Sequence, residues 1–212
     1  MNIKNIKQEL TNFLRNQDIL TITQRGVTTQ SDTGTFTAAD THTLATNPTT
    51  TKNIRSVIVA TTTLTYGEEY TVNFDTGVIS FVLSQTGAYT ISYDTGTDSI
   101  FPDYPRDDLT INSYPRIAID LLNAPGDAFG IGGDRFISDV AFTIVVYGDN
   151  SDDLDGYVDS IKDAFITDAK NFFYLNFTKR TLIGPTINSQ DRSNEIMQKN
   201  VDYLAQFDVE SS

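Results

Sequence analysis

The stretch DVAFTIVVYGDNSDDLDGYVDSIKDAF, from Asp139 to Phe165, changes its apolar spacing on either side of an acidic turn. Before the turn, apolar residues alternate with other residues, which is typical of a β-strand; they are Val140, Phe142, Ile144 and Val146. After the turn, apolar residues recur at helical spacing; they are Leu154, Tyr157, Val158, Ile161, Ala164 and Phe165. The stretch therefore predicts a strand followed by a helix with a continuous apolar stripe.

The acidic turn between them has two interpretations, a helix start or a calcium loop. Ser151 or Asp149 is suited to cap the helix, and aspartates in a first helical turn meet free N–H groups and the positive end of the helix dipole. An EF-hand loop requires Gly at its sixth position and Glu at its twelfth. Counted from Asp149, those positions hold Leu154 and Ser160. We therefore predict a capped helix and no metal site.

Further elements of the same kind lie near both ends of the chain. Apolar residues at helical spacing predict a first helix; they are Ile3, Ile6, Leu10, Phe13 and Leu14. Three more segments are typical of strands; they are YPRIAIDLL (114–122), FFYLNFTKRTLIGP (172–185) and NEIMQKNVDYLAQFDVE (194–210). The first helix needs these segments to bury its stripe, so we expect one core to contain them all.

Residues 25–100 follow a different pattern. The first part is rich in Thr, Ser, Gly and Asp, whose side chains compete with a helical backbone. Tyr70, Val72 and Phe74 alternate before the turn sequence DTG, and Tyr89, Ile91 and Tyr93 alternate after a second predicted turn at QTG. This part predicts a small all-β sandwich or barrel.

These observations predict an α+β chain. Its core is a two-layer α/β sandwich, helix–strand–strand–helix–strand–strand, formed by residues 1–24 and 101–212. Residues 25–100 form an inserted all-β accessory domain.

Composition limits the classes of function. The chain of 212 residues has 28 acidic and 15 basic residues, a formal net charge of −13, so tight binding to nucleic acid is not expected. It has no cysteine, which excludes disulfides and thiolate sites. No apolar run is long enough for a membrane helix and the N-terminus does not resemble a secretory signal, so we expect synthesis in a cytoplasm and no membrane partner.

No catalytic or cofactor-binding constellation is predicted. His42 is the only histidine, so a Ser–His–Asp triad would depend on one poorly placed base. GIGGDR (130–135) lacks the Lys–Ser/Thr of a phosphate-binding loop. Asp107 and Asp108, like Glu68 and Glu69, are neighbours on extended chain and point to opposite faces, so neither pair suits a glycosidase. We expect no enzyme activity.

The order of elements resembles that of the tail terminator, or tail completion, proteins of long-tailed bacteriophages and related archaeal tailed viruses. The stretches that carry the resemblance are MNIKNIKQELTNFL, YPRIAIDLL, VAFTIVVYG, DDLDGYVDSIKDAF, NFTKRTLIGPT and KNVDYLAQFDVE. The inserted domain departs from the family pattern. The resemblance implies a structural virion protein without cofactor or catalysis, which forms a hexameric ring at the head–tail junction.

The resemblance also implies the partners: other copies of the chain, the tail tube protein and a neck or connector protein, with double-stranded DNA passing through the lumen.

The Gly-rich segment NAPGDAFGIGGDR (123–135) exposes Phe129 and Ile131, which we predict to lie at a subunit or tube interface. Lys179 and Arg180 either protect a strand edge or contact an acidic partner. Asp127 or Asp134 is expected to face the lumen and repel the phosphates of the passing DNA.

Two other interpretations remain open besides an unrecognised hydrolase. One is a neck or head–tail adaptor ring protein of the same particle, which the sequence does not separate from a terminator. Alternatively, aromatic residues of the β domain present rings to a carbohydrate or a host surface, or else form that domain's core; they are Tyr66, Tyr70, Phe74, Phe81, Tyr89 and Tyr93. Oligomeric state separates a ring protein from a monomeric binding module.

Overall fold

The computed structural model of the chain describes residues 3–46, 51–102, 114–123, 126–129, 135–168, 177–184, 187–191 and 194–210. The chain divides into two compact units. Unit 1 comprises Met1–Leu20 and Ser99–Ser212, and unit 2 comprises Thr21–Asp98. The boundaries expected from the sequence were 24/25 and 100/101.

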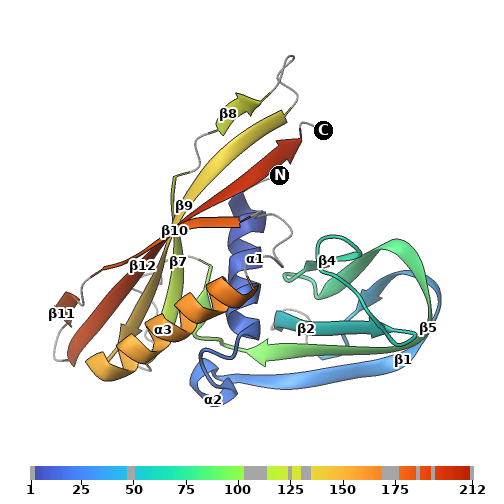
Figure 1. Cartoon of the computed structure of the whole chain (residues 1–212). Helices are drawn as coiled ribbons and strands as arrows, with labels where there is room; N and C mark the ends of the chain where they lie inside the picture. The colour runs from blue at the N-terminus through green and yellow to red at the C-terminus, as the bar shows by residue number, and fades with distance from the viewer. Residues whose placement is uncertain are drawn as a thin grey trace. The chain divides into compact units, whose positions relative to one another are not determined.

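Unit 1 is built on a seven-stranded sheet with the strand order β10-β12-β9-β7-β6, in which β11 also pairs with β12 and β8 with β9 (Figure 1). All its strand pairs are antiparallel except β6 with β7. The elements of unit 1 are α1 (Ile3–Asn16), β6 (Ile100–Phe101), β7 (Arg116–Asn123), β8 (Gly126–Phe129), β9 (Arg135–Gly148), α3 (Ser151–Asp168), β10 (Phe177–Ile183), β11 (Ile187–Asp191) and β12 (Asn194–Glu210).

Both helices of unit 1 pack on the same face of this sheet. The stripe of α1 is buried through Ile6, Leu10 and Leu14, and the stripe of α3 through residues that include Val158 and Ile161. Burial of the apolar side chains of α3 contributes on the order of 10 kcal/mol before chain entropy is subtracted. Neither helix, nor any other in the part of the chain described, is long and apolar enough to span a membrane.

The strand register decides which residues meet the helices. Ile144 in β9 pairs with Ile119 in β7 and with Val201 in β12, and all three are fully buried beneath the helices. Because side chains alternate across a strand, the next row lies on the opposite face. Asp120 and Asp202 flank Thr143 in that row, and the hydroxyl of Thr143 donates to Oδ1 of Asp202 at 2.7 Å.

Unit 2 is built on a five-stranded sheet with the order β1-β5-β2-β3, in which β4 also pairs with β5. Its elements are α2 (Ile22–Arg25), β1 (Val27–Thr43), β2 (Thr51–Val59), β3 (Thr62–Thr63), β4 (Tyr70–Asn73) and β5 (Val78–Gly96). Its core is separate from that of unit 1 and contains Phe36, Leu44, Ile54, Val57, Val59, Leu64, Tyr70, Ile79, Phe81, Ile91 and Tyr93. Unit 2 therefore has the buried apolar set that an independent domain needs.

The predicted α/β sandwich is wrong for this chain, which is mostly β. The described residues form twelve strands and three helices, and unit 2 has one sheet, not two facing sheets. The strands are longer and more numerous than we expected from the positions of turn-forming residues in the sequence. The most informative case is β5, which runs through the QTG sequence at 85–87 as one continuous strand. Gly87 has φ +116° there, and a Cβ would lie 3.0 Å from Cβ of Ala60, so this glycine serves a close approach within a strand and not a turn.

The remaining predicted elements are found. Helices occur at Ile3–Asn16 and Ser151–Asp168, and strands occur within the segments predicted at 114–122, 172–185 and 194–210. The segment 123–135 is predicted to be a loop, but residues 126–129 form β8, which pairs with the start of β9. A strand of only four residues is too short to show a period in the sequence.

Candidate functional site

The two chain segments that begin and end unit 2 meet side by side. α2 is capped by Thr21, whose hydroxyl accepts from the N–H of Gln24, and it ends at Gly26 in the left-handed conformation. Val27 then pairs with Gly96 at the far end of the unit. A Cβ on Gly96 would lie 2.5 Å from the carbonyl oxygen of Gly26, so only glycine allows the two backbones to come this close.

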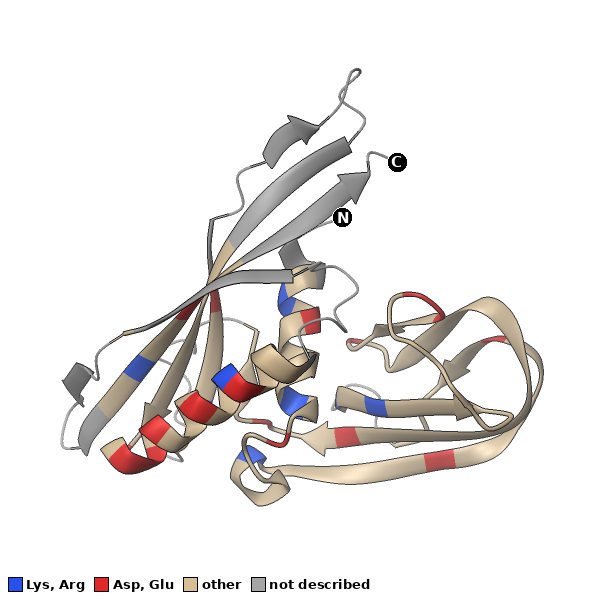
Figure 2. Ribbon diagram, in the orientation of Figure 1, with Lys and Arg blue, Asp and Glu red and all other residues tan. Residues whose placement is uncertain are grey.

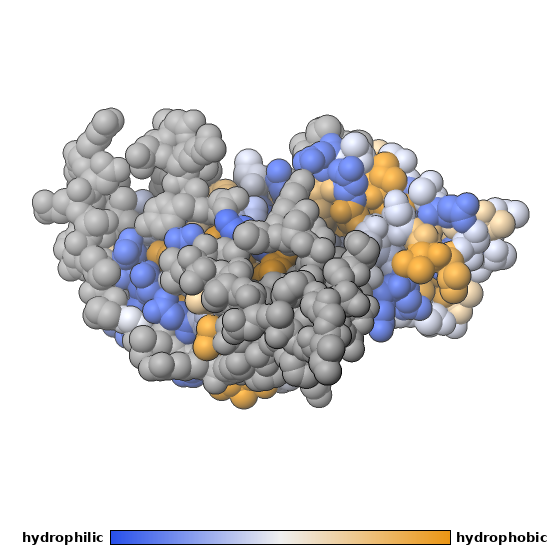
Figure 3. Space-filling view, turned by 90° about the horizontal axis from the view of Figure 1, so that it is seen from above, coloured by the Kyte–Doolittle hydropathy of each residue, from blue (hydrophilic) through white to orange (hydrophobic). Residues whose placement is uncertain are grey.

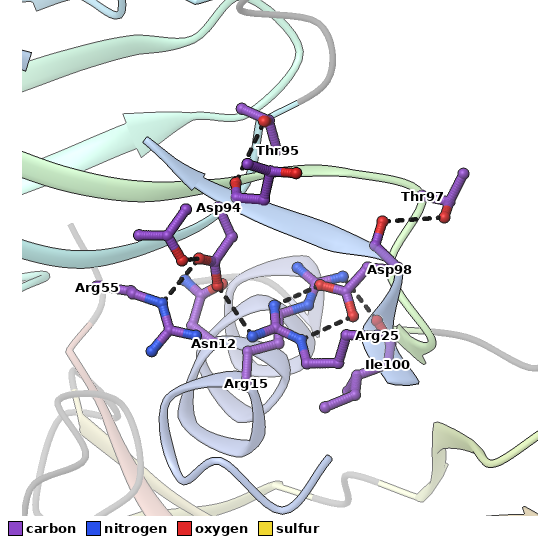
Figure 4. Close-up of polar contacts among 12 residues, drawn as sticks. Asn12, Arg15, Arg25, Arg55, Asp94, Thr95, Thr97, Asp98 and Ile100 are labelled. Carbon is purple, nitrogen blue, oxygen red and sulfur yellow. Dashed lines mark hydrogen bonds and ion pairs between the residues drawn. The ribbon is translucent and has the colours of Figure 1, made fainter. Parts of the chain in front are cut away.

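Next to this crossing lies an ion cluster, which we call the Arg25 clamp: the buried Arg25, Asp94 and Asp98 with the partly exposed Arg55 (Figure 4). The exposed Thr29 completes the clamp. Arg25 binds Asp98 at two points, Nη2 to Oδ2 at 2.6 Å and Nε to Oδ1 at 3.2 Å. Its Nη1 donates to Oδ2 of Asp94 at 2.9 Å. The other oxygen of Asp94 accepts from Nε of Arg55 at 2.7 Å and from the hydroxyl of Thr29 at 2.8 Å.

The clamp is electrically balanced, with two guanidinium groups and two carboxylates. The side chains of Arg25 and Asp94 are fully buried. Burial raises the pKa of Asp94, but the hydrogen bonds from Arg55 and Thr29 and the charges of Arg25 and Arg55 outweigh it, and the pKa lies below its usual 3.8. Asp94 is therefore an ionised, fully engaged acceptor. The arrangement suits the joining of distant chain segments and not proton transfer.

A second polar group in unit 2 surrounds the single histidine. Asp32 accepts at Oδ1 from the hydroxyl of Tyr93 at 2.9 Å and at Oδ2 from the N–H of Ala45 at 2.7 Å, and Nε2 of His42 lies 3.3 Å from Oδ2. The ring of His42 packs edge-on against Phe36, with the ring centroids 5.6 Å apart. Within the described residues, the hydrogen-bond partner of His42 is Asp32 and no serine or threonine hydroxyl is bonded to its ring, so the geometry there does not form a triad. Asp32 instead fixes the chain that leaves β1.

The acidic start of α3 is a helix cap, but the capping residue is Asn150 and not Ser151 or Asp149 as predicted. Oδ1 of Asn150 accepts from the N–H of Asp152 at 3.0 Å, and its carbonyl accepts from the N–H of Leu154 at 3.2 Å. Asparagine caps as well as serine or aspartate does, and sequence alone does not choose between neighbours.

Aspartates continue along the exposed side of α3 (Figure 2). Asp155 binds Lys199 of β12, and Oδ1 of Asp159 lies 2.5 Å from Nζ of Lys162. The hydrogen bond from Lys162 lowers the pKa of Asp159. Across the residues that the structure describes, no group of three or more His, Cys, Asp or Glu side chains is arranged to hold a metal ion.

The predicted interface residues fall in two places. Asp127 and Phe129 lie in β8, opposite Ile137 and Arg135 of β9, while Ile131 and Asp134 lie outside the described residues. The grouping of these four residues stays a prediction.

Lys179 and Arg180 lie in β10, at the edge of the sheet of unit 1. The register of β10 against β12 shifts between Thr178 and Arg180. Whether these two residues protect the edge or contact an acidic partner stays a prediction.

The aromatic residues of unit 2 do not form an exposed platform. Tyr70, Phe81 and Tyr93 are buried, and Tyr66, Phe74 and Tyr89 pack partly buried against the same core. Burial also raises the pKa of Tyr70. Other apolar residues lie at the surface of the molecule (Figure 3). In unit 2 the large apolar residues with exposed side chains are Ile22, Val82 and Leu83.

Sequence reasoning missed the Arg25 clamp and the row of Asp120, Thr143 and Asp202. The clamp joins residues 69 and 73 positions apart, and no spacing in the sequence predicts such a pairing. Part of the row was predictable, because the alternation in β7 places Asp120 on the face of the sheet opposite to that of Ile119. The alignment of Asp120 with Asp202 depends on the strand register, which the sequence does not show.

No protein-family model matches the chain, and no curated protein matches it either. The functional inference therefore depends on the residues themselves and on the resemblance in element order.

Proposed function

We propose that the chain is a structural protein of a tailed virus, a ring-forming tail terminator that caps the tail tube and joins it to the neck. The order of elements in unit 1 supports this: α1, then the inserted unit 2, then β7 and β9, then α3, then β10 and β12. These are the segments that carry the resemblance to the terminators. Because α1 and α3 occupy one face of the sheet, ring contacts would use its edges, β8 and its other face.

The charge of the chain fits a passage for DNA. A formal net charge of −13 opposes tight binding of phosphate, so DNA could slide through a lumen without being held. Asp120 and Asp202, on the face of the sheet away from the helices, join Asp127 and Asp134 as candidates to line that lumen. In this proposal the chain works in the neck region of the virion, after assembly in the host cytoplasm, and has no catalytic role.

Native mass spectrometry and negative-stain electron microscopy of the purified full chain test the proposal. We expect closed rings, six subunits each if the family pattern holds, and no retention of double-stranded DNA on a filter at low salt. A chain that stays monomeric at every concentration contradicts it. A ring that binds isolated tail tubes supports the terminator, whereas one that binds only head connectors supports the neck adaptor alternative.

A double variant tests the predicted contact at β8 and the residues after it. Phe129→Ser with Ile131→Ser should weaken ring assembly and change the monomer's unfolding free energy by less than about 1 kcal/mol. The control is Val82→Ser with Leu83→Ser, which removes two apolar side chains that are 63% and 74% exposed in unit 2 and should leave the ring intact. Loss of fold stability with normal assembly in the Phe129 and Ile131 variant would assign those residues to the core.

A second candidate function is a binding module for a carbohydrate or host surface on unit 2. The observation that favours it is the exposed pair Val82 and Leu83, since the aromatic residues are in the core. A glycan array and binding to host cells test it. Binding by the monomer that is lost with Val82→Ser and Leu83→Ser would favour this function over the ring.

A further inference from the structure

Strand β1 presents a long, regular edge. Its residues from Val27 to Phe36 pair one by one with β5 from Gly96 to Gly87, with no register shift. β1 is the terminal strand of its sheet, and no other strand of the described residues pairs with its outer edge. Open backbone N–H and C=O groups along such an edge are a template for another strand.

Among the described residues, the other strand edges are short, charged or irregular, which are protections known from natural sheets. Most of the strands that lie at an end or along a side of the two sheets are short: β3 and β6 have two residues each, β4 and β8 have four each, and β11 has five. The seven residues of β10 include Lys179 and Arg180 and a register shift.

β2 pairs with β3 only at Ile58 and Val59, but the rest of β2 carries Lys52 and Arg55 and has two register shifts against β5. β7 pairs with β6 only at Ile117 and Ala118, but the rest of β7 carries Asp120 and has a register shift against β9.

The regular part of β1 has none of these protections. Val27 to Phe36 contains no Lys, Arg or Pro. Its single charged residue, Asp32, is buried and bound to Tyr93 and to the N–H of Ala45, so its carboxylate does not guard the edge. Irregularity begins only beyond Phe36, where Ala38 has φ +50° and the register shifts.

We propose that this edge pairs with the β1 edge of a second copy of the chain, antiparallel and about a two-fold axis, so that two sheets of unit 2 become one. The exposed side chains there all carry hydroxyl groups, and hydroxyl side chains opposite one another stabilise antiparallel pairs; they are Thr28, Thr29, Ser31, Thr33 and Thr35. The net charge of −13 opposes self-association over most surfaces, but the exposed side chains of this edge carry no charge. The pairing is independent of the ring and doubles the mass of whatever species unit 1 forms.

Analytical ultracentrifugation of the full chain over a wide concentration range, with hydrogen exchange by mass spectrometry, tests the pairing. We expect a species of twice the mass of the smallest one, and slower amide exchange in residues 27–36 as the concentration rises. Ser31→Lys with Thr33→Lys sets lysines of two copies against each other and should weaken the pairing roughly tenfold or more.

The matched control is Ser80→Lys with Thr90→Lys, which adds the same charge at exposed positions of the central strand β5 and should leave pairing unchanged. Both variants lower the net negative charge, so general repulsion cannot explain a loss seen only in the first. Thermal unfolding verifies that each variant folds.

Three results would overturn the proposal: no mass doubling at any concentration, doubling without added protection in residues 27–36, or equal weakening by both variants. A synthetic peptide of residues 27–36 gives a readout that needs no variant. It should compete with the pairing, and a scrambled peptide should not. Capture of unrelated extended peptides by a chain that never doubles in mass would instead assign the edge to a foreign strand.

Discussion

Arg25 and Asp98 are 73 positions apart in the sequence, and their side chains meet at two points inside unit 2, with Nη2 2.6 Å from Oδ2 and Nε 3.2 Å from Oδ1. Both are buried. The contact joins the last residue of α2 to the last residue of the unit. Unit 2 therefore holds its own two ends together through its own side chains, and this relationship leads to the first two predictions.

Arg25→Met should strongly destabilise unit 2. The variant leaves two carboxylates buried without their main cation, and breaking a buried pair in this way costs about 3–5 kcal/mol. Urea unfolding followed by tyrosine fluorescence measures the loss. Lys162→Met is the control, because it breaks a solvent-exposed pair with Asp159 and should have no measurable effect. Equal, small effects of both variants would mean that water reaches the clamp.

The clamp also predicts a pH dependence. The pKa of Asp94 in the folded chain lies below its usual 3.8, so the ionised carboxylate stabilises the fold fully above that value. As the pH falls through the lowered pKa, Asp94 takes up a proton and this stabilisation is lost. The unfolding free energy of unit 2 should therefore fall below about pH 4, with a smaller slope in Asp94→Asn. An unchanged slope in the variant would assign the acid sensitivity to other carboxylates.

The start of α3 gives a prediction that distinguishes capping from metal binding. Asn150→Ala removes the acceptor for the N–H of Asp152 and should cost about 1 kcal/mol, whereas Ser151→Ala should cost little. Asp155→Asn should be nearly neutral because Asp155 is exposed. The melting temperature should not change with calcium, and a marked rise would contradict the capping explanation.

The core position Ile161 tests how the same helix packs. Ile161→Asp puts an unpaired charge among residues that are fully buried in unit 1, and should cost several kcal/mol. Circular dichroism during thermal unfolding measures the change. The control is Ile166→Asp, at a position that is 75% exposed on the same helix. A stable Ile161→Asp variant would show that α3 does not depend on this face.

The amphipathic helices and the strands of unit 1 were predictable because each element has its own period. Leu10 and Leu14 in α1, or Leu154 and Ile161 in α3, show by spacing alone which side is buried, and the structure buries them. The predicted cap of α3 was wrong by one residue, because Asn150 caps the helix and not its neighbours Ser151 or Asp149.

What sequence reasoning could not supply is pairing over long distances. The predicted turn at 85–87 is a continuous strand, because β1 and β2 flank β5 and tertiary pairing overrides a local preference for a turn. Long-distance pairing also explains why the Arg25 clamp was not predicted. It explains the wrong prediction of a two-layer α/β sandwich as well, because long paired strands such as β1 and β5 make the chain mostly β.

The last prediction is that the two units fold separately. Their cores share no residue, and the ends of unit 2 are paired by Val27 with Gly96 and by the Arg25 clamp. A fragment of residues 21–98 should therefore unfold cooperatively, and so should a chain in which a short flexible linker replaces those residues. Circular dichroism and calorimetry measure both. In the fragment, Arg25→Met should abolish the cooperative transition, because the buried Asp98 loses two hydrogen bonds from Arg25 and the buried Asp94 keeps Arg55 but loses Arg25. A fragment that is unfolded although it carries the intact clamp would show that unit 2 needs unit 1 to fold.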